Sequence, residues 1–273
     1  MSNKKPIILV VDDDPQVLRA VVRDLRNHYA KDYRLMSTTS ANEALESLKD
    51  IKNKNESVAL LLSDQRMPEM LGVEFLAKGK ELFPEAKRIL LTAYSDTEAA
   101  IRAINEVELD YYLMKPWDPP EEKLFPAIDE QLDEWRSTHV PAFEGIRIVG
   151  YQWSPRSHHI KDFLSGNLIP YQWLDIETNE SAKELVTLNG IDSTGMPAVF
   201  FEDGSFLQNP DLTAVGQKTG MRSKASKTMY DVTIIGAGPS GLAAAVYGGS
   251  EGLNTSLIEK RAPGGQAGTS SRI

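Results

Sequence analysis

The chain has 273 residues, of which 41% are hydrophobic and 25% charged, enough to fill two compact domains and leave a remainder. A net charge of −9 and a pI near 5.1 argue against a direct nucleic acid partner. Because no run approaches a membrane span and Met1 to Pro6 lacks an apolar core, we expect no membrane association and a cytoplasmic location. The absence of cysteine excludes disulfides and thiolate metal sites within this chain.

The first stretch, from Ile7 to about Ser137, alternates short hydrophobic runs with amphipathic segments. That alternation is typical of a doubly wound parallel α/β sheet. Five runs are predicted to be strands: Ile7 to Val11, Tyr33 to Ser37, Val58 to Ser63, Arg88 to Thr92 and Tyr111 to Met114. Asp118-Pro119-Pro120 is predicted to open the last helix, so residues 1–137 are expected to form one domain.

Polar residues follow these predicted strands, where ligands bind in such sheets. Asp12 and Asp13 follow the first strand, Asp64 the third, Thr92 ends the fourth, and Lys115 follows the fifth. Three converging carboxylates form a hard oxygen site suited to Mg²⁺. A central carboxylate, here Asp64, can then act as nucleophile on a phosphoryl donor and form an acyl phosphate. The Thr92 hydroxyl and Lys115 would stabilise the transferred negative charge.

Four motifs in this order resemble the receiver domain of response regulators: Val10-Val11-Asp12-Asp13-Asp14-Pro15, Ser63-Asp64-Gln65-Arg66-Met67-Pro68, Leu91-Thr92-Ala93 and Met114-Lys115-Pro116-Trp117. The resemblance covers the first half of the chain. It implies a five-stranded receiver fold and a sensor histidine kinase, or another phosphodonor, as partner. A receiver-shaped domain that never takes phosphate remains the alternative.

The same resemblance assigns roles to single residues. Asp12, Asp13 and Asp64 would hold Mg²⁺ together with the backbone carbonyl of Arg66, and Asp64 would accept the phosphoryl group. We interpret the neighbouring acid, Asp14, differently, because an Asp before a proline is typical of a helix N-cap.

Thr92 and Tyr112 match the family's switch pair, in which the aromatic ring moves inward when the threonine hydroxyl turns toward the phosphate. A partly buried ring without a switching role is the alternative for Tyr112. The neighbouring Tyr111 is expected in the core.

A second domain is predicted at residues 146–219, after a short linker at residues 138–145. Its pattern predicts a strand at 146–151, a helix at 157–164, a strand at 171–176, a helix at 180–188 and a hairpin turn at 202–205. These pieces resemble glutaredoxin and thioredoxin, with Ile169-Pro170-Tyr171 before the second strand and Met196-Pro197 at the usual cis-proline position.

The decisive departure from that family lies at the redox loop, because Ser154-Pro155-Arg156-Ser157 stands in place of its C-x-x-C. A serine forms no thiolate near neutral pH and no disulfide, so we expect a redox-inert domain. The serines could be natural or engineered. The cleft between Ser154, Pro197 and Trp153 could bind a peptide or protein partner, and a rigid spacer is the alternative.

A short basic linker at residues 220–229 leads to the last segment, 230–273. Tyr230 to Ile235 is predicted to be a strand, Leu242 to Tyr247 lies in a helix, and Thr255 to Glu259 is a second strand. Between the first strand and the helix lies Gly236-Ala237-Gly238-Pro239-Ser240-Gly241, the G-x-G-x-x-G pattern of dinucleotide-binding Rossmann units. A glycine-rich hairpin is the alternative.

The run Pro263 to Gly268 resembles the segment beside the isoalloxazine ring in thioredoxin reductase-like flavoproteins. The resemblance covers residues 230–273 only and implies FAD as cofactor of a longer flavoprotein, an FAD/NADPH-dependent oxidoreductase. The implied FAD contacts are Gly236, Gly238, Gly241, Glu259, Gly265 and Gln266. Because the predicted Rossmann unit is incomplete and cysteine is absent, we do not expect this chain alone to be an active oxidoreductase.

The sequence therefore favours a two-component response regulator whose receiver controls an attached flavoprotein output. The alternative is a signalling adaptor in which the thiol-free middle domain binds a partner and the flavin region is vestigial. The cognate kinase and the oligomeric state cannot be predicted from these patterns.

Overall fold

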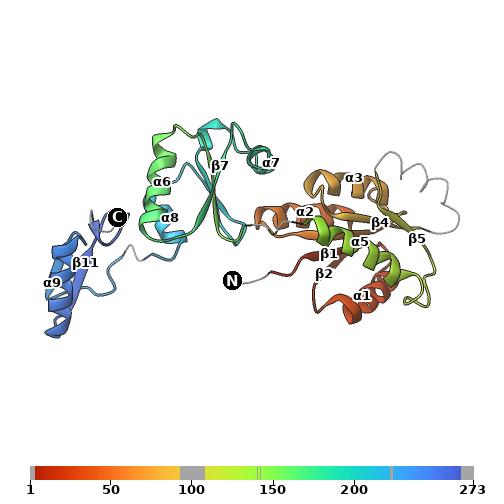
Figure 1. Cartoon of the computed structure of the whole chain (residues 1–273), viewed down its shortest axis with the longest axis horizontal. Coiled ribbons are helices and arrows are strands. Elements are labelled where there is room, and N and C mark those ends of the chain that lie inside the picture. Colours follow the sequence, from red (N-terminus) through yellow and green to blue (C-terminus); the bar gives the residue numbers. More distant parts are fainter. Residues whose placement is uncertain (1–3, 93–107, 140, 142, 222–223, 266–273) are drawn as a thin grey trace. The chain divides into compact units, whose positions relative to one another are not determined.

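A computed structural model describes residues 4–92, 108–139, 141, 143–221 and 224–265 (Figure 1). The chain divides into two compact units, Met1–Glu144 and Gly145–Ile273, and each is described by itself. Across these described ranges, no helix is both long and apolar enough to cross a membrane.

The first unit is built on a five-stranded sheet in the order β2-β1-β3-β4-β5, with every neighbouring pair parallel. This confirms the predicted doubly wound parallel sheet, and the strands agree with the predicted runs to within a residue at each end. Its elements are β1 (Ile7–Val11), α1 (Pro15–Tyr29), β2 (Arg34–Thr38), α2 (Ala41–Asn53), β3 (Val58–Asp64), α3 (Gly72–Leu82), β4 (Lys87–Thr92), β5 (Tyr111–Met114) and α5 (Leu124–Thr138).

Helices cover both faces of this sheet, which explains why its central strands are apolar on both sides. Ile8 and Val10 of β1 pack in the cluster that contains α1 and α5. Ile7 and Leu9 pack in the cluster that contains α2 and α3 (Figure 1). Because all neighbouring strands are parallel, their carboxyl ends lie at one edge of the sheet.

Local signals set where two of these helices begin. Asp14 is the N-cap of α1, where its carboxylate accepts hydrogen bonds from the backbone amides of Gln16 and Val17, as its interpretation as a cap predicted. The last helix begins at Leu124 rather than at Asp118, so that prediction was wrong. Because a residue before proline is disfavoured in the helical conformation, Pro120 keeps Pro119 out of the helix.

The second unit contains a four-stranded sheet in the order β7-β6-β8-β9, in which β6 and β7 are parallel and the other pairs antiparallel. Helices α6 and α8 pack with one apolar cluster and α7 with the other. The elements are β6 (Ile146–Gly150), α6 (Pro155–Gly166), β7 (Tyr171–Asp175), α7 (Glu180–Leu188), the 3-10 helix η2 (Ser193–Gly195), β8 (Ala198–Phe200), β9 (Phe206–Gln208) and α8 (Leu212–Lys218).

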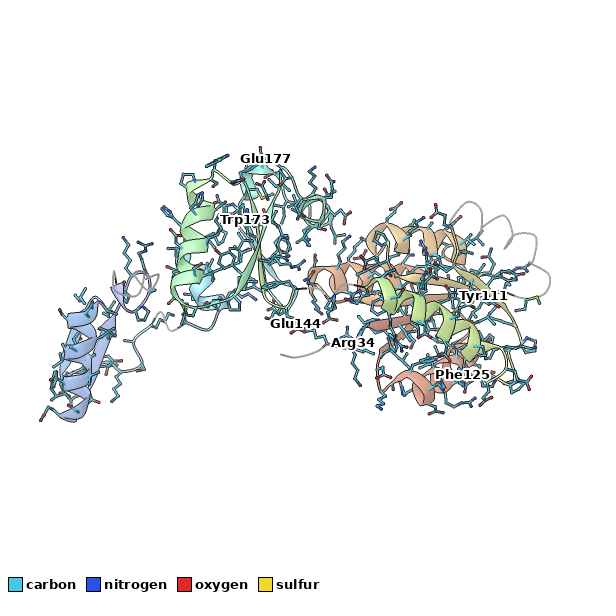
Figure 2. The ribbon with its side chains drawn as sticks, viewed as in Figure 1. Arg34, Tyr111, Phe125, Glu144, Trp173 and Glu177 are labelled. Carbon is cyan, nitrogen blue, oxygen red and sulfur yellow. The ribbon has the colours of Figure 1, made fainter. Side chains whose placement is uncertain are left out.

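This element order confirms the predicted strands and helices of the second domain. The Met196–Pro197 peptide bond is cis, as predicted. Trp173 on β7 lies beside α6, where the Lys161 Nζ atom sits 4.4 Å from its ring centroid (Figure 2). The thioredoxin-like family assignment itself stays a proposal.

The chain continues into β10 (Val232–Ile235), α9 (Pro239–Ser250) and β11 (Thr255–Ile258), with the two strands parallel. The predicted strand–helix–strand order is thereby confirmed. None of the residues of α9 is buried, and Ile235 and Val246 are 86% and 71% exposed. A two-stranded sheet with an uncovered apolar helix has little core of its own.

Candidate functional site

The side chain of Lys115 joins two carboxylates at the carboxyl edge of the first sheet. Its Nζ atom lies 2.8 Å from Asp12 Oδ2 and 2.5 Å from Asp64 Oδ1. Asp12 follows β1, Asp64 ends β3, and Lys115 follows β5, so three strand ends separated by up to 103 residues meet at one point. The predicted convergence of these three residues is therefore observed.

Burial makes this cluster electrostatically unusual. Asp12 is only 1% exposed, and burial raises its pKa, although hydrogen bonding to Lys115 and the Lys115 charge oppose the rise. Burial alone would lower the pKa of Lys115, but its hydrogen bonds to Asp12 and Asp64 outweigh burial, so the net pKa is raised. Lys115 therefore remains protonated at neutral pH and offsets part of the negative charge of the two acids.

The backbone around Asp64 is held closely. The Arg66 amide donates to Asp64 Oδ2 at 2.6 Å, and the Gln65 amide donates to the Leu91 carbonyl at 2.9 Å. Behind them, a Cβ atom on Gly72 would lie 1.9 Å from the Asp64 carbonyl oxygen. Glycine at position 72 thus allows the first turn of α3 to pack against the backbone of the candidate acceptor.

The predicted switch residues lie on the two neighbouring strands β4 and β5. Thr92 is fully buried at the end of β4. Tyr112 is half-buried and packs with the cluster of α2 and α3. Tyr111 is 40% exposed rather than in the core, so that prediction was wrong (Figure 2). The physical reason is that β5 is an edge strand.

The predicted Mg²⁺ ligands are gathered only in part. Asp12 and Asp64 meet at Lys115, whereas Asp13 is half-exposed. Among the residues that the structure describes, no group of three or more His, Cys, Asp or Glu side chains is placed to hold a metal ion. Two carboxylates that converge on one cation fit the oxygen chemistry that Mg²⁺ requires. A site completed by Asp13 and the Arg66 carbonyl stays a prediction.

The thiol-free loop, Ser154 to Ser157, lies at the start of α6 in the second unit. Ser154 is the N-cap of that helix, and its Oγ accepts from the Ser157 amide at 3.4 Å. The Ser157 hydroxyl is fully buried and has no hydrogen-bond partner among the described residues. A Cβ on Gly150 would lie 2.8 Å from Ser157 Oγ and 3.1 Å from Pro197 Cβ, so these residues pack together. Trp153 next to them is 81% exposed.

The glycine-rich turn at the start of α9 has the geometry that its pattern predicts. Gly236 has a φ of +97°, and a Cβ on Gly241 would lie 1.9 Å from the Gly236 carbonyl oxygen. No atom of the described residues lies within 4 Å of a Cβ on Gly238, at the N-terminus of α9, where a phosphate could bind.

The other predicted FAD contacts gather partly around this turn. Glu259 Oε2 accepts from the Ala237 amide at 2.7 Å, and a Cβ on Gly265 would lie 3.2 Å from Gly238 Cα. Hydrogen bonds from the Ala237, Arg261 and Lys260 amides lower the pKa of Glu259. A carboxylate has about four acceptor positions, so Glu259 retains capacity for a ribose hydroxyl. Gln266 lies outside the described residues.

Sequence reasoning missed one residue near the candidate acceptor. Glu69, in the loop between β3 and α3, accepts hydrogen bonds from the Ser40 hydroxyl and the Asn42 amide. The available signal was Ser40, a good N-cap residue before α2, but nothing in the sequence paired it with a residue 29 positions away.

Comparison with known families identifies the first unit. Residues 8–128 match the family described as "Response regulator receiver domain". Residues 8–128 are therefore a response regulator receiver domain. This match lies within the first unit and does not extend to residues 145–273.

Two curated relatives are transcriptional regulatory proteins. The chain is 38% identical over 119 residues to the hydrogenase transcriptional regulatory protein HoxA of Cupriavidus necator, which covers 44% of this chain and 23% of that protein. It is 32% identical over 158 residues to the protein of the same name from Bradyrhizobium diazoefficiens, covering 58% of this chain and 29% of that protein. The chain thus spans only about a quarter of the length of these two relatives.

One solved structure, the signal receiver domain of an HD domain-containing protein from Pseudomonas fluorescens, is 32% identical. The similarity covers 50% of this chain and 93% of that one, with a TM-score of 0.43.

Proposed function

We propose that the receiver takes a phosphoryl group on Asp64 in a Mg²⁺-dependent reaction, with a sensor histidine kinase or a small acyl phosphate as donor. The observation that carries the proposal is the placement of Lys115 Nζ within 2.8 Å of both Asp12 and Asp64 at the carboxyl edge of the sheet. Titratable groups whose pKa values are shifted by burial and by a specific charged partner cluster at functional sites.

Asp64, Lys115 and Thr92 would have different roles in phosphoryl transfer. Asp64 attacks phosphorus, an O–P bond forms on its carboxylate, and the bond to the donor breaks with its electrons leaving on the donor atom. Lys115 stays charged and can hydrogen-bond the incoming phosphoryl oxygens, while the buried Thr92 lies on the strand beside Asp64. Mg²⁺, held by Asp12, Asp13, Asp64 and the Arg66 carbonyl, would supply charge neutralisation.

Signal output would follow from a shift between two arrangements of Thr92 and Tyr112. Tyr112 is half-buried and packs with the cluster of α2 and α3, and the proposal requires a second arrangement of its ring to be populated. Phosphate on Asp64 would favour the inner arrangement because the Thr92 hydroxyl would turn toward it.

Intact-mass spectrometry of the chain with Mg²⁺ and acetyl phosphate tests the proposal. One added phosphate that is absent in an Asp64→Asn variant supports it. No addition to the wild-type chain, or the same addition to the variant, refutes it.

We also propose that the region from Tyr230 onward contributes FAD contacts to a thioredoxin reductase-like output regulated by the receiver. The support is that none of the described atoms lies within 4 Å of a Cβ on Gly238, and that Glu259 accepts a hydrogen bond from the same turn. A flavin titration followed by fluorescence, with Gly238→Asp as control, tests it. Equal binding to both proteins, or none to either, counts against FAD binding by this segment.

The adaptor function is the second candidate, because Trp153 is strongly exposed beside the thiol-free loop. Tryptophan is enriched among the residues that contribute most to protein–protein binding. If a Trp153→Ser variant retains every partner captured by the wild-type chain, this reading fails.

A further inference from the structure

The loop that follows Asp64 is tied at its outer end to a different helix. Glu69 Oε1 and Oε2 lie 2.9 Å and 2.8 Å from the Ser40 Oγ atom, and Oε2 also accepts from the Asn42 amide at 3.0 Å. Ser40 and Asn42 are the N-cap and the second residue of α2. A carboxylate at this position is favoured, because helix amides and the helix dipole both stabilise negative charge.

The same serine connects further back to β2. Its amide donates to Thr38 Oγ1 at 3.2 Å, and Thr38 Oγ1 donates to Glu43 at 2.8 Å. Thr38 is the parallel-strand partner of Val11, the residue immediately before Asp12. A continuous set of hydrogen bonds therefore joins the end of β2, the start of α2 and the loop after Asp64.

The rest of that loop is fixed from the inside. Met67 is buried among the residues of the α2 and α3 cluster, and the Gly72 amide donates to the Gln65 carbonyl at 3.0 Å. Glu69 lies between these two anchors and is exposed. Its contact with α2 is thus an outer support for the segment that carries Arg66.

We propose that Glu69 is a positioning residue for phosphoryl transfer to Asp64, acting through its hydrogen bonds to Ser40 and Asn42. This inference rests on the proposed function, because the Arg66 carbonyl is one of its metal ligands. Glu69 does not touch the reacting atoms. It holds the loop so that the Arg66 carbonyl and the Asp64 carboxylate keep fixed positions relative to each other. The conformational entropy lost when a metal ion binds is therefore smaller.

Two variants separate this role from simple helix capping. Glu69→Gln keeps the size of the side chain and one acceptor oxygen but removes the charge. Ser40→Asp keeps an N-cap acceptor for α2, since Asp caps as well as Ser, but places a second carboxylate against Glu69. Glu74→Gln, which changes an exposed carboxylate in the first turn of α3, is the matched control.

The experiment measures phosphorylation of the full chain by acetyl phosphate as Mg²⁺ is varied, together with amide hydrogen exchange of residues 65–72. We expect Glu69→Gln and Ser40→Asp each to raise the Mg²⁺ concentration for half-maximal phosphorylation about tenfold, within the range for losing a hydrogen bond to a charged group. Exchange of residues 65–72 should become faster in both variants and not in Glu74→Gln.

The inference is overturned if both variants phosphorylate with the Mg²⁺ dependence of the wild type, or if the control changes as much as they do. If the wild-type chain takes no phosphate, the proposed function fails instead. Hydrogen exchange of residues 65–72 then tests by itself whether Glu69 positions the loop. Faster exchange in both variants supports the positioning contact, and unchanged exchange refutes it.

Discussion

Replacing Gly72 by alanine should damage both phosphoryl transfer and folding. The added Cβ would lie 1.9 Å from the Asp64 carbonyl oxygen and 3.0 Å from Leu90 Cδ1. A carbon normally approaches a carbonyl oxygen no closer than about 3.3 Å, so α3 or the end of β3 must move by about 1.4 Å. Overpacking of this kind costs about 1–3 kcal/mol of stability, and a shift of about 1 Å at a reacting group costs about 100-fold in rate.

The chain offers a matched control in the same helix. A Cβ on Gly79 would lie 2.6 Å from Leu61 Cδ1, the end of a flexible side chain rather than the backbone of Asp64. We therefore expect Gly72→Ala and Gly79→Ala both to lower the free energy of unfolding, measured by urea denaturation. Only Gly72→Ala should lower the rate of phosphorylation by acetyl phosphate by about two orders of magnitude. Equal rates in the two variants would refute the reasoning.

Three further predictions concern caps, a buried hydroxyl and pH. Asp14→Ala should lower the free energy of unfolding by about 1 kcal/mol, and Asp14→Ser should restore most of that loss. Mg²⁺-dependent phosphorylation should be unchanged in both variants. A loss of phosphorylation in both would make Asp14 a metal ligand rather than a helix cap. Ser157→Ala should raise the free energy of unfolding by about 1 kcal/mol, because the change removes a buried hydroxyl without a partner. Ser154→Ala should lower the free energy of unfolding, because the change removes a helix cap. Destabilisation by both changes would contradict this prediction. Hydrogen bonds from Ser205 and Lys218 hold the pKa of Asp203 well below its usual range. The stability they confer is therefore complete above about pH 4 and is lost as the pH falls toward the folded-state pKa, so acid unfolding curves of Asp203→Asn should lack that loss.

The fold of the first unit was predictable because its sheet is covered on both faces. Strands buried on both sides become continuous apolar runs, and β1, with all five residues buried, is the clearest example. The start of α5 was not predictable in the same way. Asp118-Pro119-Pro120 carries good helix-start chemistry, but the proline pair itself excludes the helical conformation at its first member, and the helix begins four residues after Pro120.

The candidate site shows a similar division. Asp12, Asp64 and Lys115 were predictable because each stands at the carboxyl end of a recognisable strand, and parallel strands present those ends at one edge. Glu69 was not, since it lies in a loop without periodicity and its partner Ser40 belongs to a helix formed by an earlier part of the chain. Loop positions are fixed by such tertiary contacts rather than by local pattern.

The two serines of the thiol-free loop, Ser154 and Ser157, differ in their hydrogen bonding. Ser154 is satisfied as a helix cap, so its presence follows from helix stability alone. Ser157 has no such explanation, because a buried hydroxyl without a partner is destabilising, and alanine would fill the position at no cost in hydrogen bonding. Its close packing against Gly150 and Pro197 leaves no room for a large side chain. Packing between the start of α6 and the end of β6 therefore requires a small side chain at position 157, and it leaves the hydroxyl of that side chain without a partner among the described residues.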